Sequence, residues 1–206
     1  MSKSVIKWLS AFLALLLIGS AVACLAEVER ETVTSFYEPL DSLNHIVYTE
    51  TWQYPIVDGQ RSSGRPVGEG SYLGQHNFVG DTCSDCGYVK GSAINASDSY
   101  TTVADVKLDR GTPIDVALQM ILNSKASNTR LTIDGVDAGA ADKLIELVND
   151  DVALEEVLTA LSGFPAENIY DTDCRVVTVT YTDGNDQFTT ENYAFGAADG
   201  ALAAVY

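Results

Sequence analysis

Basic residues are scarce in this chain. Its 206 residues include 12 lysines and arginines against 29 aspartates and glutamates, which gives a formal net charge of −17. A surface with this balance repels nucleic acid phosphates and anionic lipid head groups. The composition therefore argues against nucleic acid as a partner and fits a soluble extracellular protein.

Histidine and the common catalytic motifs are also scarce. The only histidines are His45 and His76, whereas general acid–base catalysis near neutral pH most often uses histidine. The H-E-x-x-H, G-x-S-x-G and Walker patterns are absent, and the glycines of residues 68–74 lack the dinucleotide-binding spacing. The sequence thus favours a non-enzymatic protein.

Carboxylate pairs leave one enzymatic alternative open, an extracellular hydrolase that depends on carboxylates or on a metal. A carboxylate pair becomes catalytic through burial and spacing in three dimensions, which the sequence alone does not give. Each pair here also fits a turn, the start of a strand or a solvated helix face. The pairs are Asp171 with Asp173, Glu155 with Glu156, and Asp183 with Asp186.

Residues 1–26 have the layout of a secretory signal peptide. Lys3 and Lys7 give a basic start, residues 8–23 are mostly apolar, and small residues end the segment. We therefore predict a protein that is secreted or held on the extracellular face of the cell envelope. Residues 21–24, Ala-Val-Ala-Cys, also resemble a bacterial lipoprotein signal, in which a lipid on Cys24 would be the only membrane link. Removal of the two lysines takes the formal net charge from −17 to −19.

The remaining chain is expected to contain two parts. Residues 27–98 read as an extended, loop-rich region with a Cys/His knuckle, one candidate strand over residues 45–57 and a loop over residues 58–74. Residues 99–206 read as an α+β domain of order β-α-β-α-α-β-β, with its first strand over residues 99–108. The predicted fold class is α+β, with a mixed or antiparallel sheet, two to three amphipathic helices and a small Cys/His loop module.

The helices are predicted from apolar spacing of three and four residues. Thr112 is a suitable N-cap, and Pro113 suits the first helical position. This helix is expected to pack on a sheet that contains Val177 and Val179. The predicted buried faces are Ile114, Ala117, Leu118, Ile121 and Leu122 on the first helix, Ala141, Leu144, Ile145 and Val148 on the second, and Leu154, Val157, Leu158 and Leu161 on the third. Residues 183–186, Asp-Gly-Asn-Asp, predict a hairpin turn between the last two strands.

Cysteine is limited to three residues after the signal segment, an odd number that argues against a full disulfide framework. Cys83 and Cys86 form a C-x-x-C whose flanks lack the strand and helix of a redox enzyme. Two cysteines at this spacing can hold a zinc ion, with His76 as third ligand and His45 or Cys174 as fourth. A Cys83–Cys86 disulfide and free thiols remain the alternatives.

The stretch from His76 to Gly87 resembles a known module. It matches the pattern H-x-F-x-x-x-x-C-x-x-C-G through His76, Phe78, Cys83, Cys86 and Gly87. Such modules are found in exported and cell-surface proteins of Gram-positive bacteria. The resemblance implies export and a metal, with no known catalysis. We therefore expect an exported binding or structural protein whose partner is an extracellular protein or glycan.

Overall fold

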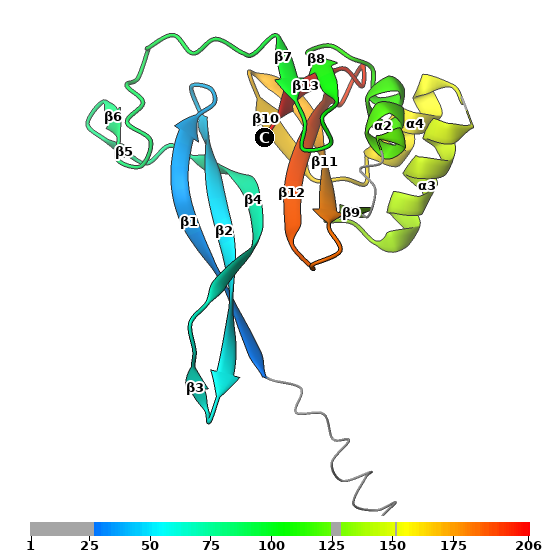
Figure 1. The fold of residues 1–206 in the computed structure, drawn as a ribbon. Helices are drawn as coiled ribbons and strands as arrows, with labels where there is room; N and C mark the ends of the chain where they lie inside the picture. The colour runs from blue at the N-terminus through cyan, green and yellow to red at the C-terminus, as the bar shows by residue number, and fades with distance from the viewer. Residues whose placement is uncertain (1–26, 125–128, 151) are drawn as a thin grey trace, which may run out of the picture. The chain divides into compact units, whose positions relative to one another are not determined.

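The structure is a computed structural model that describes residues 27–124, 129–150 and 152–206 (Figure 1). The expected signal segment, Cys24 included, lies outside the described residues. The described chain forms two compact units, one of residues 27–31 with Gln53–Arg65 and the other of Thr32–Trp52 with Pro66–Tyr206. No helix within the described ranges has the length and apolar character needed to cross a membrane.

The described residues have a mixed α+β fold with more strand than helix. The helices are α2 (Ile114–Asn123), α3 (Ala138–Asn149) and α4 (Leu154–Leu161). The strands are β1 (Val28–Pro39), β2 (Asn44–Val57), β3 (Gln60–Arg61), β4 (Arg65–Gln75), β5 (Phe78–Val79), β6 (Thr82–Cys83), β7 (Ser99–Thr101), β8 (Lys107–Asp109), β9 (Arg130–Asp134), β10 (Ala166–Ile169), β11 (Thr172–Thr182), β12 (Phe188–Gly196) and β13 (Leu202–Val205).

The largest sheet is mixed. Its strand order is β1-β2-β4-β12-β11-β10, with β3 paired to β2, β9 to β11 and β13 to β12. The pairing of β4 with β12 is parallel, whereas β12 pairs with β11 and β13 in antiparallel fashion. The predicted α+β class is therefore confirmed, although strands contribute more of the structure than the predicted order of elements implied.

The smaller unit is tied together by Arg61. Its guanidinium group pairs with the carboxylates of Glu29 and Glu31 and lies 4.8 Å from the centre of the Tyr54 ring. The Arg61 hydrogen bond lowers the pKa of Glu29. These charged groups are nearly half exposed, so solvent screens the pairs and their contribution to stability is small.

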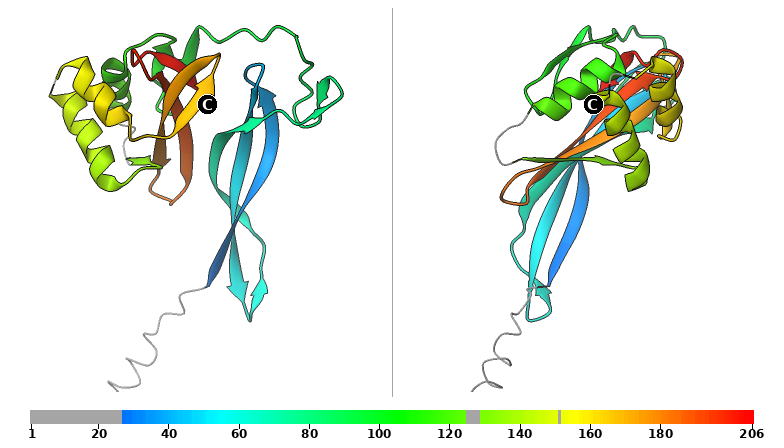
Figure 2. Two further views of the ribbon diagram at one scale, coloured as in Figure 1. Left: turned by 180° about the vertical axis from the view of Figure 1, so that it is seen from behind. Right: turned by 90° about the vertical axis from the view of Figure 1, so that its right-hand side faces the viewer.

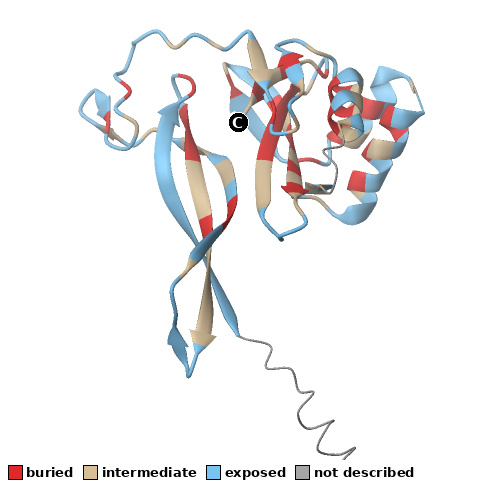
Figure 3. Cartoon of the chain, viewed as in Figure 1, coloured by how far each residue is buried: buried red, intermediate tan, exposed pale blue. Residues whose placement is uncertain are grey.

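Both faces of strand β11 contribute buried side chains, and Figure 3 marks the buried residues of the chain in red. Because successive side chains of a strand point to opposite faces, Val177 and Val179 enter one apolar core and Cys174 and Val176 enter another. The first core also contains the buried faces of the three helices, which Figures 1 and 2 show grouped on one side of β11. The second core includes Ile46 of β2 and Leu40, which directly follows β1, together with Tyr206.

Helix α2 confirms the predicted face. Its buried residues are Ile114, Ala117, Leu118 and Ile121, and they share a core with Val177 and Val179. Leu122 is half-buried. On the other helices, Leu147 is buried where Ile145 was expected, and Leu154 is 45% exposed.

The predicted N-cap is wrong. Pro113 occupies the N-cap position with an extended backbone, so the helix begins one residue later than expected. The Thr112 hydroxyl instead donates to the carbonyl oxygen of Asp109 at 2.7 Å. The hydroxyl therefore stabilises the turn before the helix and does not cap its first N–H groups.

The loop expected over residues 58–74 is a second error, because most of it forms β3 and β4. Glycine weakens a strand by leaving a gap in its side-chain surface. Here an aromatic ring fills one such gap, because a Cβ added at Gly68 would collide with the ring of Phe188. Rings that cover strand glycines restore the missing packing.

The strand expected over residues 99–108 is two short strands. β7 and β8 form an antiparallel pair around a turn in which Asp105 takes a φ of +57°. The Thr102 side chain accepts the Val106 N–H at 3.2 Å. This local bond competes with continued strand and explains the reversal.

The hairpin predicted at residues 183–186 is confirmed. It joins β11 to β12, and the Asp183 carboxylate accepts the N–H groups of Asn185 and Gln187 at 2.8 and 2.9 Å. These bonds lower the pKa of Asp183. Asp183 therefore serves the turn. The boundary expected at residue 99, between the loop-rich region and the α+β domain, stays a prediction.

Candidate metal centre

Two histidines and two cysteines converge in the larger unit. Each of His45, His76, Cys83 and Cys86 offers one ligand atom, and these four atoms all lie within 4.8 Å of one another. The Cys83 Sγ lies 3.7 Å from His45 Nδ1, and the Cys86 Sγ lies 3.3 Å from His76 Nδ1. His45 and Cys83 are buried, and the other two are partly exposed. The group has the residue types and the spacing to hold a metal ion.

Neighbouring strands bring the histidines together. His45 lies near the start of β2, and His76 directly follows β4, the next strand in the sheet. Their ring centres are 5.2 Å apart. The missing side chain of Gly74 makes room for His45, because a Cβ there would lie 2.6 Å from the His45 Nε2.

The cysteines are held by a short hairpin. β5 and β6 pair antiparallel, with Phe78 opposite Cys83. The Gly87 N–H donates to the carbonyl oxygen of Cys83 at 3.0 Å, and the Cys83 N–H donates to Tyr88 at 2.8 Å. Gly87 has a φ of +76°, which glycine adopts without a steric penalty. This tight turn brings both sulfurs to the same side.

The environment favours one thiolate before any metal binds. Burial alone would raise the pKa of Cys83, but hydrogen bonds from the backbone N–H groups of Cys86 and Asp85, together with hydrogen bonding to the imidazoles of His76 and His45, lower it to about 5. Burial and the neighbouring Cys83 sulfur raise the pKa of Cys86. A thiolate is the form of cysteine that binds metals.

A second layer of contacts orients His76. Its Nε2 lies 2.9 Å from the carbonyl oxygen of Asp41, so a proton on Nε2 leaves Nδ1 free to face the cysteines. Such a bond from the far nitrogen is the usual support of a metal-binding histidine. The Tyr88 ring stacks on the His76 ring at 4.7 Å. The Asp41 carboxylate accepts the backbone N–H groups of Asn44 and Tyr170, which fixes this turn.

The structure separates the two candidates for the fourth position. His45 joins the predicted residues His76, Cys83 and Cys86. Cys174 is buried in the second apolar core, where burial raises its pKa to about 11. The three cysteines of the described residues are free thiols. Both sulfurs of the C-x-x-C are therefore available to a metal.

Sequence reasoning missed three supporting residues: Asp41, Gly74 and Tyr88. Asp41 acts through its backbone carbonyl. Every residue has this group, so the identity of residue 41 gave no indication of the contact. Gly74 is two residues before His76, and a glycine so close to a candidate ligand on a strand was the one available clue. The ring of Tyr88, the second residue after Cys86, lies against His76.

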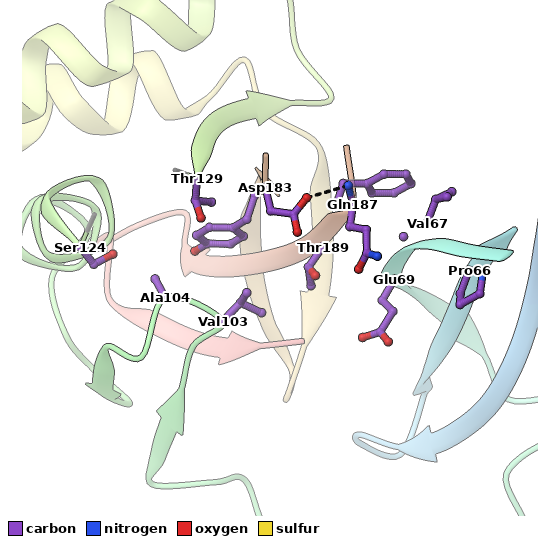
Figure 4. Close-up of a pocket in the computed structure, with 13 residues that line it drawn as sticks. Pro66, Val67, Glu69, Val103, Ala104, Ser124, Thr129, Asp183, Gln187 and Thr189 are labelled. Atoms are coloured by element: carbon purple, nitrogen blue, oxygen red, sulfur yellow. Dashed lines mark hydrogen bonds between the residues drawn. The ribbon is translucent and has the colours of Figure 1, made fainter. Parts of the chain in front are cut away.

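The carboxylate pairs weighed for catalysis lie mostly at the surface. Asp171, Asp173, Glu155, Glu156 and Asp186 are exposed. Asp183 lines a cavity of about 320 Å³, shown in Figure 4, but its carboxylate is engaged by the turn. The carboxylate of Glu69 points away from this hydrogen bond. No carboxylate pair named from the sequence therefore converges here.

Comparison with known protein families, with curated protein sequences and with solved structures gives no match for this chain.

Proposed function

We propose that this chain is an exported, non-enzymatic binding or structural protein whose Cys83, Cys86, His45 and His76 hold a structural zinc ion. The observation that carries the proposal is the convergence of the four ligand atoms within 4.8 Å. Export is supported by the pattern of residues 1–26 and by the resemblance of residues 76–87 to modules of exported proteins.

The donor set and its spacing favour zinc. Zinc is bound tetrahedrally at about 2.0–2.1 Å from nitrogen and about 2.3 Å from sulfur, so neighbouring nitrogen and sulfur ligands lie about 3.6 Å apart. The two nitrogen–sulfur distances of 3.7 and 3.3 Å are close to this value. Calcium and magnesium instead prefer oxygen ligands.

A structural role follows from the number of ligands. Catalytic zinc sites keep one position open for water or substrate, whereas structural sites are closed by four protein ligands. With His45 as the fourth ligand, the coordination sphere of the zinc ion would be complete. This argument supports a non-enzymatic protein over the alternative, a metal-dependent hydrolase.

The metal would fasten the cysteine hairpin to the N-terminal strands. β5 and β6 have two residues each, too few to make a stable hairpin alone. Because two ligands come from the hairpin and its turn and two from β2 and the end of β4, zinc would join these segments. The surface that zinc orders in this way would carry the binding site for a partner. We propose that this partner is an extracellular protein or glycan.

Native mass spectrometry of the purified protein, before and after chelation, tests the zinc site. We expect one zinc per chain that is lost with chelator, and a Cys86→Ser variant that binds zinc much more weakly. Cys174→Ala is the matched control, because it removes a cysteine outside the group and should retain the metal. A protein purified without zinc that takes up none on reconstitution, or a Cys83–Cys86 disulfide, would refute the proposal.

A further inference from the structure

A second cavity of the larger unit has an unusual combination of side chains. Its volume is about 330 Å³, and it is open to solvent. Three aromatic residues and three carboxylates line it, with hydroxyl and small residues between them, and its lining contains no lysine, arginine or histidine. The six principal residues are Phe36, Tyr48, Tyr206, Glu50, Glu69 and Glu191.

The aromatic part is preassembled. The rings of Phe36 and Tyr48 stack with centres 4.2 Å apart and an angle of 19° between their planes. Phe36 is nevertheless 54% exposed, so the chain leaves much of this stack uncovered. The face of an aromatic ring carries partial negative charge and attracts cations.

Two of the three carboxylates are held by hydrogen bonds, and none of the three has a cationic partner among the described residues. Glu191 is only 8% exposed, and it accepts hydrogen bonds from the Tyr193 hydroxyl and the Val103 N–H. Glu50 accepts the indole N–H of Trp52 at 3.2 Å. Within the described residues the salt bridges involve only Glu29, Glu31 and Glu146. No cationic side chain of the described residues therefore pairs with the carboxylates of the cavity.

We propose that this cavity binds an organic ammonium group of the quaternary type. Aromatic faces with nearby carboxylates recognise such cations, as in cages for choline and methylated lysine. A quaternary group is preferred over a primary ammonium, because a primary ammonium is strongly hydrated and costs more to move out of water. This inference does not rest on the zinc site, which uses none of these residues.

The cavity of Figure 4 is the weaker candidate. It shares Glu69, Val103 and Thr189 with the proposed site. Its other carboxylate, Asp183, already accepts two backbone N–H groups, and it has no stacked pair of rings. An ammonium group there would have one free carboxylate at most.

Isothermal titration calorimetry of the full protein with choline tests the proposal. The decisive comparisons use two other compounds. One is 3,3-dimethylbutan-1-ol, which has the same shape as choline without the charge, and the other is Nα-acetyl-lysine amide, whose side chain carries a primary ammonium. We expect saturable binding of choline, and we expect the neutral analogue to bind at least about tenfold more weakly. The lysine derivative should also bind more weakly than choline.

Matched variants locate the site. Phe36→Leu and Glu69→Gln should each weaken choline binding by about fivefold or more. Tyr72→Leu is the aromatic control, because Tyr72 is also 54% exposed but does not line the cavity, and Glu155→Gln is the charge control. No saturable binding at millimolar choline, equal binding of the neutral analogue, stronger binding of the lysine derivative, or equal loss in the control variants would each overturn the proposal.

Discussion

The backbone of Gly74 lies so close to the imidazole of His45 that a methyl group added there would be 2.6 Å from Nε2. A residue that binds nothing itself thus determines where a candidate ligand is placed. Gly74→Ala should force the ring of His45 to move and weaken zinc binding by about 10–100-fold, the usual effect of disturbing the support of a metal ligand. Competition with a chromogenic zinc chelator measures this change.

Gly184→Ala is the control for that substitution. An added Cβ at Gly184 meets nothing within 4 Å, so zinc affinity should be unchanged. An unaltered affinity in Gly74→Ala would show that His45 is not a ligand in the position described.

The two thiols should titrate separately in the metal-free protein. Hydrogen bonding lowers the pKa of Cys83 to about 5, while burial and the Cys83 sulfur raise that of Cys86. Ultraviolet absorbance of thiolate, followed against pH in Cys174→Ala protein, should show a first step near pH 5 and a second above the usual range of cysteine. A single step at the ordinary cysteine pKa would contradict the described hydrogen bonding.

Glu191 should make the protein less stable as pH rises. Burial raises the pKa of Glu191 above its ordinary value of 4.5, so the folded state binds this proton more tightly than the unfolded state. Its stabilising contribution is complete below pH 4.5 and is lost as pH rises through the higher folded-state pKa.

Urea unfolding at a series of pH values tests this. The free energy of unfolding of wild type minus that of Glu191→Gln should fall as pH rises from below 4.5 to neutral. Glu155→Gln, at an exposed site on α4, should show no such trend. A difference that grows with pH would reverse the sign and disprove the prediction.

Leu118 should be a major contributor to the core. It is completely buried on α2, so Leu118→Ala should lower the free energy of unfolding by about 2–5 kcal/mol. Val116→Ala on the same helix removes a side chain that is 43% exposed and should change stability by less than about 0.5 kcal/mol. If chemical denaturation showed equal losses of stability for the two substitutions, the buried face assigned to α2 would be wrong.

The exported protein should begin after the apolar segment. N-terminal sequencing is expected to find residue 27 first, or a lipid-modified Cys24 if the lipoprotein signal is used. Recovery of intact Met1 from the exported protein would refute cleavage.

The helices and the last hairpin were predictable because their signals are local. Apolar spacing gave the buried face of α2, and Asp183 with its neighbours gave the turn. β4 was not predictable, because two of its glycines, Gly68 and Gly74, lie against the rings of Phe188 and His45, which are distant in sequence.

The candidate metal centre shows the same division. His76, Cys83 and Cys86 lie within one short stretch, so their spacing could be read directly. The choice between His45 and Cys174 depended on which strand lies beside β4, and sheet order is a long-range property. The sequence could name both residues without ranking them.

The span between the ligands has a consequence for the unfolded chain. His45 and Cys83 are 38 positions apart, so an ion that holds both closes a long loop, as a covalent bridge would. A disulfide over such a loop restricts the disordered ensemble by about 4 kcal/mol in the simple chain-entropy model. The metal centre would thus act as a removable crosslink, one that a stronger chelator in the surroundings can open without any bond of the polypeptide being broken.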